Sequence, residues 1–244
     1  MEPSAYLEMA AMEARHWWFT GRRRVLAAII RSLRLPPRAE ILELGSGTGG
    51  NLAMLSGFGA VTAVEMNDIA RDIAAARAPF VELHPGLLPH DLPLAERCFD
   101  LVCLFDVLEH IEDDAATLRE IRVRLKPGAA AIITVPAYKA LFGPHDKAHH
   151  HKRRYEQSEL REKLEAAGLR AERLTFINTA LLPAAFALRW LDRALNRAEA
   201  AAAGIPPAPV NALLAALFGA EAYLLPRLSL PFGLSLLAVV RKAD

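Results

Sequence analysis

Short apolar runs alternate along the chain with stretches of helical periodicity. Predicted strands cover residues 39–44, 60–65, 80–84, 99–104, 129–135, 169–177 and 234–240. Apolar positions recur at helical spacing in the segments 20–33, 67–76, 114–124 and 157–167. Because strands and helices alternate in this way, the pattern predicts an α/β fold with a largely parallel sheet that is covered on both faces.

The first predicted strand leads directly into a glycine-rich turn, ILELGSGTGGNL at residues 41–52. Gly45, Gly47 and Gly49 permit a tight turn and let a ligand approach the backbone, while the helix that follows offers its first N–H groups. Gly45, Gly47 and Gly50 also satisfy G-x-G-x-x-G, the dinucleotide fingerprint. The turn therefore predicts a nucleotide-like ligand without choosing between a dinucleotide and another cofactor.

Acidic side chains at two strand ends narrow this choice. Glu43 stands two residues before the first glycine, where it could hold a cationic amine, whereas a dehydrogenase normally has an apolar residue there. Glu65 closes the second predicted strand, where an acid can bind both ribose hydroxyls. The stretch HDLPLAERCFDLVCLFDVLEHIEDD, residues 90–114, then carries further acids and a histidine around the fourth predicted strand.

Taken together, these ordered motifs resemble the class I S-adenosylmethionine-dependent methyltransferases, specifically the small-molecule group that includes the ubiquinone-pathway O-methyltransferases. The resemblance covers residues 16–177 and the last strand. It implies a Rossmann-like seven-stranded sheet of order 3-2-1-4-5-7-6, with the last strand antiparallel. It also implies S-adenosyl-L-methionine as the cofactor. The cofactor-binding residues that it predicts are Glu43, Gly45, Ser46, Gly47, Gly49, Glu65, Met66, Asp91, Leu92, Asp106, Val107 and His110.

The stretch richest in ionisable side chains is GPHDKAHHHKRRY, residues 143–155, which follows the fifth predicted strand. Ligands in open α/β sheets bind beyond the carboxyl ends of the strands, so this stretch is predicted to lie over the active site. We expect His145 to be the general base, because an imidazole can take a proton near neutral pH, and Asp146 to orient it or the acceptor. The predicted substrate contacts are His16, Trp17, Trp18, Tyr138, His150, Arg154 and Tyr155.

Two metal sites are alternatives to this interpretation. Asp146 and the histidines of the 143–155 stretch would have to converge, but adjacent residues point apart and no CxxC or HExxH spacing is present. Asp106, Glu109 and His110 are similar to a Glu-x-x-Glu-His cluster of the ubiquinone-pathway enzymes, but aspartate shortens the reach of the first ligand. No metal is therefore predicted. A further alternative is a solvated loop whose cations pair with acids of the next helix.

The motifs divide the chain into an N-terminal helical lid (1–38), a cofactor-binding core (39–177), a helical apolar insertion (178–231) and the final strand of the core (232–244). The insertion holds two mostly apolar segments, but prolines and charged residues interrupt both, so neither is predicted to cross a membrane. We expect a cap or a homodimer interface. The alternative is an apolar substrate channel or a peripheral membrane patch for a lipid-linked acceptor.

Composition excludes several classes of protein. A formal net charge of +1 provides no global basic field, so a dedicated nucleic-acid binder is disfavoured. Cys98 and Cys103 are the only cysteines and are expected to be reduced thiols of a cytoplasmic protein. The N-terminus has no uninterrupted apolar segment, so no secretory signal is expected.

The function that these observations predict is methyl transfer from S-adenosylmethionine to a small-molecule acceptor, with O-transfer ahead of N- or C-transfer. The acceptor is expected to be apolar or lipid-linked if the insertion guides it. The alternatives are an NAD-dependent oxidoreductase that uses the same glycine turn and a non-catalytic cofactor-binding protein.

Overall fold

A computed structural model describes residues 3–183 and 204–243 of the chain. Its sheet contains seven strands in the order β3-β2-β1-β4-β5-β7-β6, which confirms the predicted order. The strands are β1 (Ala39–Leu44), β2 (Gly59–Glu65), β3 (Glu82–Pro85), β4 (Phe99–Phe105), β5 (Leu125–Pro136), β6 (Leu169–Ile177) and β7 (Ser235–Lys242). β7 is antiparallel to both of its neighbours, β5 and β6, and the other pairs are parallel, as predicted.

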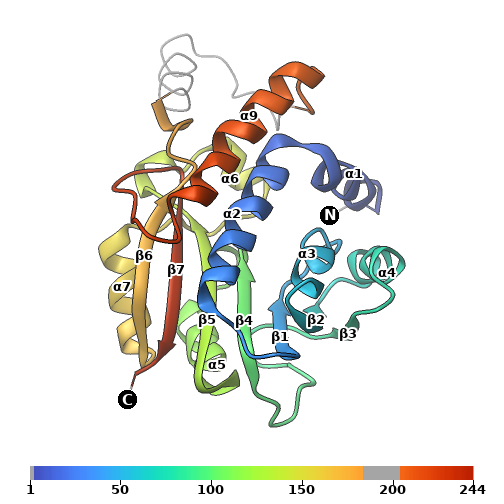
Figure 1. Cartoon of the computed structure of the whole chain (residues 1–244). Helices are drawn as coiled ribbons and strands as arrows, with labels where there is room; N and C mark the ends of the chain where they lie inside the picture. The colour runs from blue at the N-terminus through green and yellow to red at the C-terminus, as the bar shows by residue number, and fades with distance from the viewer. Residues whose placement is uncertain (1–2, 184–203, 244) are drawn as a thin grey trace.

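Helices cover both faces of the sheet (Figure 1). The described helices are α1 (Pro3–Arg15), α2 (Trp17–Leu33), α3 (Leu52–Ser56), α4 (Asp68–Arg77), α5 (Asp114–Arg124), α6 (Pro144–Ala148), α7 (Gln157–Ala166) and α9 (Ala208–Ala220), with 3₁₀ turns η1 (Leu108–His110), η2 (Lys139–Leu141) and η3 (Glu221–Tyr223). Apolar side chains of α2, α3 and α9 pack on one face of the sheet, and those of α5 and α7 pack on the other. The core is therefore divided by the sheet into two apolar layers.

Local sequence signals explain where several helices begin. The side chain of Asn67 accepts a hydrogen bond from the Ala70 N–H and starts α4, and Asp113 caps α5 in the same way. α7 begins with a capping box between Glu156 and Glu159. These caps satisfy N–H groups that the first turn of a helix leaves unpaired.

Two predicted boundaries are wrong for identifiable reasons. The helix predicted at 20–33 begins at Trp17 rather than at residue 20, because the His16 ring accepts from the Trp18 N–H and caps α2. β5 begins at Leu125 rather than at residue 129, because Leu125 already pairs with Phe99 before a register shift. The Lys-Pro-Gly segment at 126–128 is not typical of a strand. β5 nevertheless includes it, and the pairing of β5 with β4 shifts in register there.

The described part of the insertion packs on the N-terminal segment. The Asn211 side chain of α9 accepts from the Trp17 N–H at 2.8 Å and donates to the Arg15 carbonyl at 2.9 Å. Gly21 of α2 lies so close to Phe218 that a Cβ on Gly21 would come within 2.8 Å of the ring. Most of the first predicted apolar segment lies outside the described residues. Among the helices that the structure describes, none is long and apolar enough to cross a membrane.

Candidate cofactor and acceptor site

The glycine turn after β1 has an open position at its centre. A Cβ on Gly45 would meet Val107 at 2.7 Å, and a Cβ on Gly49 would meet Ala74 of α4 at 3.0 Å, so these two glycines permit close packing within the protein. All three glycines have a positive φ, but Gly47 is different because a Cβ there would meet nothing within 4 Å. The space beside Gly47 is therefore available to a ligand.

Glu65 fixes the shape of this turn from the end of β2. Its two carboxylate oxygens accept from the Gly47 N–H at 2.8 Å and the Asn67 N–H at 2.9 Å. Met66 follows and is exposed, and the pair Asp91 and Leu92 lies just beyond β3, with the Asp91 side chain exposed. The structure thus gathers these predicted cofactor residues at the carboxyl ends of neighbouring strands.

Buried polar atoms without partners surround the methionine end of the predicted cofactor position. Glu43 accepts from the Asn51 side-chain amide at 2.9 Å, but its second oxygen has no hydrogen-bond partner in the described structure. The Asn51 carbonyl oxygen and the Ser46 hydroxyl are also buried and unpartnered. Buried polar atoms are normally hydrogen-bonded, so these atoms indicate the position of a polar ligand. The two free acceptors, on Glu43 and Asn51, suit an ammonium group.

Burial raises the pKa of Glu43 to about 8, against the opposing effects of the Asn51 hydrogen bond and the positive charge of Arg22. A cationic ligand group would favour the ionised carboxylate and offset this cost. Ionised Glu43 therefore lowers the stability of the fold when no cationic group is bound beside it, and this cost can be measured.

We expect Glu43→Gln to stabilise the cofactor-free protein at pH 8. The pKa of Glu43 is about 8 in the folded chain and near 4.5 in the unfolded chain, so the folded state binds the proton more tightly. The stability that comes from the protonated Glu43 carboxyl is fully present below pH 4.5, the pKa in the unfolded chain. It is lost as the pH rises toward 8, the pKa in the folded chain. Thermal unfolding should show a gain of up to about 4 kcal/mol at pH 8 and little gain at pH 4.5. A variant that is less stable than wild type at pH 8 would contradict this account.

Arg22 is a site residue that the sequence interpretation missed. It extends from α2 into the region between the ends of β1 and β4, is buried, and forms an ion pair through Nη1 with Asp106. Its guanidinium lies 4.3 Å from the centre of the Trp18 ring. The i, i+4 spacing of Trp18 and Arg22 places them on one helical face and could have signalled this contact. Among the predicted cofactor residues, Asp106 is thus held by a partner 84 positions away in sequence.

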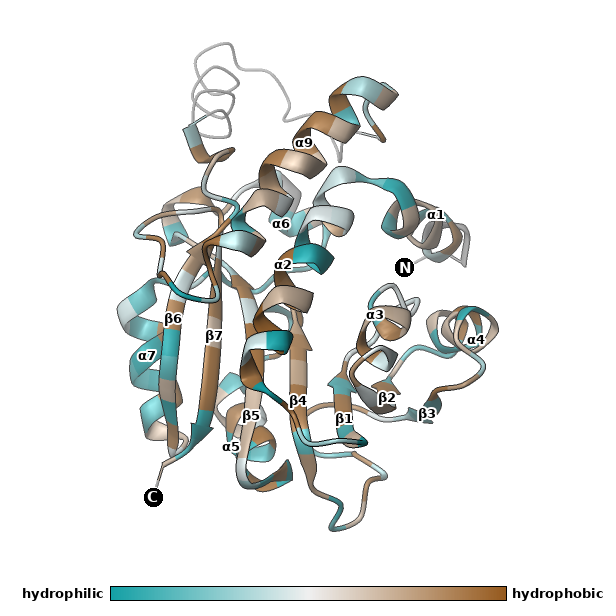
Figure 2. Ribbon diagram, viewed as in Figure 1, coloured by the Kyte–Doolittle hydropathy of each residue, from teal (hydrophilic) through white to brown (hydrophobic). Residues whose placement is uncertain are grey.

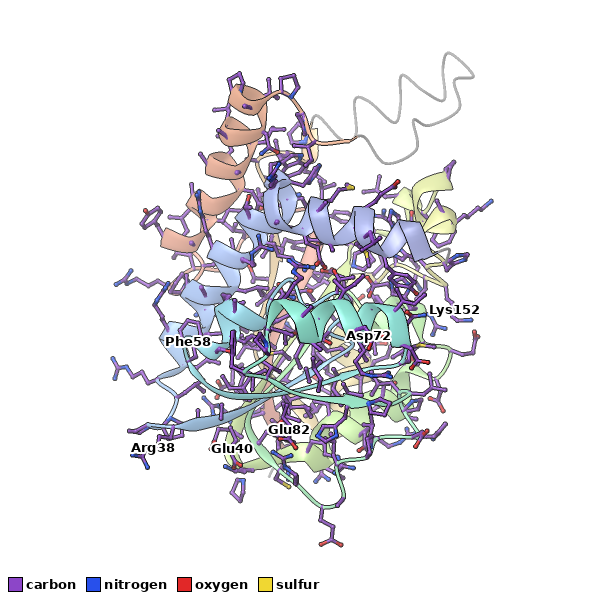
Figure 3. All side chains as sticks on the ribbon, turned by 90° about the vertical axis from the view of Figure 1, so that its right-hand side faces the viewer. Arg38, Glu40, Phe58, Asp72, Glu82 and Lys152 are labelled. Carbon is purple, nitrogen blue, oxygen red and sulfur yellow. The ribbon has the colours of Figure 1, made fainter. Side chains whose placement is uncertain are left out.

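The 143–155 stretch lies over the end of β4, as its position after the fifth strand predicts. The Lys152 N–H donates to the Glu109 carbonyl at 2.8 Å, which fastens the stretch to η1. Figure 3 shows Lys152 far from Arg38 and Glu40, which lie where β1 begins. The stretch therefore sits toward the carboxyl ends of the parallel strands.

Within this stretch, Asp146 is fully buried and contacts His151, Arg154 and the backbone of Gly143. One carboxylate oxygen lies 2.9 Å from Nδ1 of His151 and 2.8 Å from Nε of Arg154, and the other accepts from the Gly143 N–H. Burial acts to raise the pKa of Asp146, but the hydrogen bonds from His151 and Arg154 outweigh it and hold this pKa well below its ordinary value. Asp146 therefore orients His151. The side chain of His145, which belongs to α6, lies outside the described part of the structure.

His151 is also close to two groups that follow β4. Its ring stands edge-on to that of His110, with centroids 4.7 Å apart. Potential ligand atoms of Glu109, His110 and His151 all lie within 4.8 Å of one another. Burial, together with the neighbouring His151, lowers the pKa of His110 to about 4, while burial and the nearby Asp106 charge raise the pKa of Glu109 well above its usual range. This cluster joins Glu109 and His110, from one of the two metal alternatives, to His151, from the other.

The predicted substrate contacts lie in different surroundings. Trp18 lines the region beside Arg22, and His150 is exposed with a φ of +58°. Trp17 and His16 instead hold α2 and α9 together: Trp17 packs edge-on against Phe218, and His16 caps α2. Tyr138 stacks on Phe176 with centroids 5.3 Å apart.

Tyr155 is corrected from a substrate contact to a core residue. Its side chain has no exposed surface, and its hydroxyl donates to Asp114 at 2.9 Å. Arg154 is likewise buried and supports the loop by donating to Asp146 and the Ala137 carbonyl. The sequence around Tyr155 is basic and polar and does not predict burial. The contact that buries its hydroxyl is with Asp114 of α5, which is distant in sequence.

α1 closes over the glycine turn through another unpredicted residue, Glu13. Its carboxylate accepts from Arg77 at 2.8 Å and contacts the Thr48 hydroxyl, and a Cβ on Gly50 would come within 2.7 Å of it. Arg23 of α2 donates to the Glu13 carbonyl at 2.8 Å. The third glycine of the dinucleotide fingerprint, Gly50, therefore faces this helix.

Comparison with known families decides between the cofactor classes. A family model described as "Methyltransferase domain" matches residues 15–174, which contain the glycine turn, both strand-end acids and the 143–155 stretch. The chain belongs to the class I S-adenosylmethionine-dependent methyltransferase family. Its cofactor is S-adenosylmethionine, and the open position at Gly47 and the unpartnered atoms of Glu43 and Asn51 fit that molecule. The NAD-dependent oxidoreductase alternative is set aside.

Individual relatives agree with the family match. A Mycolicibacterium smegmatis protein named "Probable S-adenosylmethionine-dependent methyltransferase" is 29% identical over 137 residues, which cover 54% of this chain and 52% of the relative. The dTDP-4-amino-2,3,4,6-tetradeoxy-D-glucose N,N-dimethyltransferase of Saccharopolyspora spinosa is 30% identical over 104 residues, or 41% of each protein. The methyltransferase chain thus spans about half, or somewhat less, of the length of these curated relatives.

The fold is also similar to that of solved structures. A chain of the complex between the Haloferax volcanii Trm112 methyltransferase activator and a methyltransferase superposes with a TM-score of 0.61 at 19% identity. The match covers 96% of this chain and 93% of that one. This likeness shows the fold alone, and the ubiquinone-pathway group stays a prediction.

Proposed function

We propose that this methyltransferase transfers the methyl group of S-adenosylmethionine to a hydroxyl of a small-molecule acceptor, with His151 as the general base. The observation that carries this proposal is the contact between buried Asp146 and partly buried His151 beside the end of β4. Val107, which follows β4, contacts Gly45 of the cofactor turn, so the cofactor and histidine regions adjoin. His145 stays a competing candidate for the same role.

When bound, the cofactor supplies a methyl group that is already electrophilic. The protein then has to align the acceptor, exclude water and remove the acceptor proton. Asp146 holds Nδ1 of His151, which fixes the tautomer with the proton on Nδ1 and leaves the lone pair of Nε2 free to accept a proton. A hydroxyl acceptor benefits most from such a base, which is why O-transfer is favoured.

An amine acceptor is the second candidate, because the Saccharopolyspora spinosa relative is named as an N,N-dimethyltransferase of an amino sugar. A neutral amine needs less help from a base than a hydroxyl does. Turnover of an amine acceptor should therefore depend much less on His151.

An apolar or lipid-linked acceptor is supported by the insertion. Val210, Leu213 and Leu217 of α9 are exposed, and Figure 2 shows that α9 is hydrophobic along most of its length. Asn211 on the same helix contacts the backbone of Trp17, so this apolar surface adjoins the start of α2. Peripheral membrane contact or a homodimer through α9 would cover these side chains.

Methyl transfer can be tested without knowing the acceptor. The purified chain is incubated with S-adenosylmethionine labelled in its methyl group and with polar, amine-rich and lipid fractions of a cell extract. We expect label in an ether product of the lipid or apolar fraction, identified by mass spectrometry. Label only in amines would favour N-transfer. Cofactor binding without label in any fraction would favour the non-catalytic alternative.

A further inference from the structure

We propose that the outer face of α9, together with the segment that follows η3, docks on a bilayer that contains anionic lipids. This docking surface combines exposed apolar side chains with exposed cations beside them. Its members are Val210, Leu213 and Leu217 of α9, Leu224 and Leu228 after η3, and the cations Arg24 and Arg227.

The outer face of α9 lacks the polar residues that a water-facing helix normally carries. None of the 13 residues of α9 is charged, and its polar residue, Asn211, is hydrogen-bonded to the backbone where α1 meets α2. Val210, Leu213 and Leu217 share one face at i, i+3, i+7 spacing and are 46%, 59% and 42% exposed. A helix that is apolar on all sides is normally buried, so this face indicates a partner that covers it.

The opposite face of α9 is fixed at the carboxyl edge of the sheet. Phe218 packs edge-on against Trp17 and lies beside Gly21 of α2. Directly after α9, Glu221 of η3 accepts at 2.8 Å from the N–H of Asn178, which follows β6. β5 and β6 are both antiparallel to β7, so the end of β6 lies at the same edge as the end of β5 (Figure 1). The docking surface therefore lies at the same edge of the sheet as the candidate site.

Charge complementarity favours an anionic bilayer over a second copy of the chain. Between residues 204 and 234, Glu221 is the one carboxylic side chain and is buried, whereas Arg227 is the one cation and is exposed. Arg24 of α2 is also exposed, and its side chain lies beside Gly219 of α9. In a twofold dimer these cations would meet the same surface of the partner, to which the 204–234 segment contributes no exposed acid. Anionic lipids supply both negative headgroups and an apolar interior.

Docking through this surface would place the candidate site next to the headgroups. α2, to which α9 is fixed, carries Trp18 and Arg22, and Arg22 pairs with Asp106 directly after β4. A lipid-linked acceptor would then present its reactive group to the site while its apolar chain stays in the bilayer. This consequence for the acceptor rests on the proposed function, whereas the docking itself does not.

The test is flotation of the purified chain with vesicles of phosphatidylcholine alone and of phosphatidylcholine mixed with phosphatidylglycerol. We expect wild type to partition onto the anionic vesicles at least about tenfold more strongly than onto the neutral ones. Leu213→Ser/Leu217→Ser should partition onto the anionic vesicles at least about tenfold less strongly than wild type, because two apolar side chains no longer enter the bilayer. Arg24→Gln/Arg227→Gln should lose about 10- to 30-fold with anionic vesicles at low salt, and less than about twofold with neutral ones.

Matched controls remove side chains of the same kind from other surfaces. Val123→Ser removes an apolar side chain of α5 that is 51% exposed, and Arg161→Gln removes an exposed cation of α7. α5 and α7 pack on the face of the sheet opposite α9, so both variants should partition like wild type. Circular dichroism and calorimetry with S-adenosylmethionine check that each variant is folded, since the docking surface contains none of the predicted cofactor residues.

Several results would overturn the proposal. They are wild type that floats with neither kind of vesicle, Leu213→Ser/Leu217→Ser that floats like wild type, and control variants that lose as much as the surface variants. Analytical ultracentrifugation without lipid tests the competing occupant: a dimer that Leu213→Ser/Leu217→Ser dissociates would assign the surface to a second copy of the chain.

Vesicle binding is measured without an acceptor, so its failure is distinguishable from a failure of the proposed function. Absence of flotation would leave methyl transfer to a hydroxyl standing. A water-soluble acceptor found in the labelling experiment would remove the lipid-linked acceptor and leave the docking to be decided by flotation alone.

Discussion

Replacing Gly47 with leucine is expected to abolish binding of S-adenosylmethionine while the fold is retained. The Gly47 backbone has a φ of +54°, and the space that its Cβ would enter contains no protein atom within 4 Å. A leucine side chain would therefore occupy the position of the ligand. We expect a loss of at least ~3 kcal/mol of binding free energy, or more than about 100-fold in Kd, measured by calorimetry.

Gly128 offers a closely matched control for the backbone cost. It lies within β5, has a φ of +73°, and a Cβ there would also meet nothing within 4 Å. Both Gly47→Leu and Gly128→Leu should lose about 1–3 kcal/mol of stability from the left-handed conformation, but only Gly47→Leu should lose cofactor binding. Unchanged affinity in Gly47→Leu, or equal losses in the two variants, would disprove the assignment of the turn.

His151→Ala is expected to lower turnover of a hydroxyl acceptor by on the order of 10² or more, because it removes the proposed general base. Affinity for S-adenosylmethionine should stay near the wild-type value, since the glycine turn and Glu65, two of the predicted cofactor contacts, lie at the ends of β1 and β2. Single-turnover rates with the acceptor found in the labelling experiment provide the measurement. Asp146→Asn should also lower turnover, because it no longer fixes the tautomer of His151, and it should destabilise the loop by removing the negative charge that pairs with Arg154.

His145→Ala tests the competing prediction from the sequence. A large loss of turnover in His145→Ala, with His151→Ala close to wild type, would move the base to α6. Chelator treatment adds a second arm, since potential ligand atoms of Glu109, His110 and His151 lie within 4.8 Å of one another. Activity that disappears with chelator and returns with a divalent cation would make His151 a metal ligand rather than a base.

The position of the predicted cofactor residues at the carboxyl ends of the strands could be predicted because their signals are local in sequence. Gly45, Gly47 and Glu43 stand within five positions of one another, and Glu65 ends the next strand. In a parallel sheet, every strand delivers its carboxyl end to the same edge, so a strand-end motif is placed once the alternation of strands and helices is recognised. The sheet order, too, came from the ordered motifs and their family resemblance rather than from any single residue.

The contacts in the proposed acceptor region could not be predicted from the sequence, because they join residues that are far apart in the chain or choose one of several adjacent histidines. The 149–151 run offers three consecutive histidines, and the backbone of the loop decides that His151 meets Asp146 while His150 faces outward. Arg22 reaches Asp106 across 84 positions, and Glu13 reaches Arg77 across 64.

Burial likewise needed the tertiary structure. Tyr155 follows a basic run, yet it becomes part of the core because α5 supplies Asp114 as its hydrogen-bond partner. The sequence by itself determined the alternation of elements, the nucleotide-binding turn and the strand-end acids, because short segments encode backbone conformation and periodicity. Only the tertiary structure decided which polar side chains are paired, which are buried and which remain free for a ligand, because packing brings those groups together from separate elements.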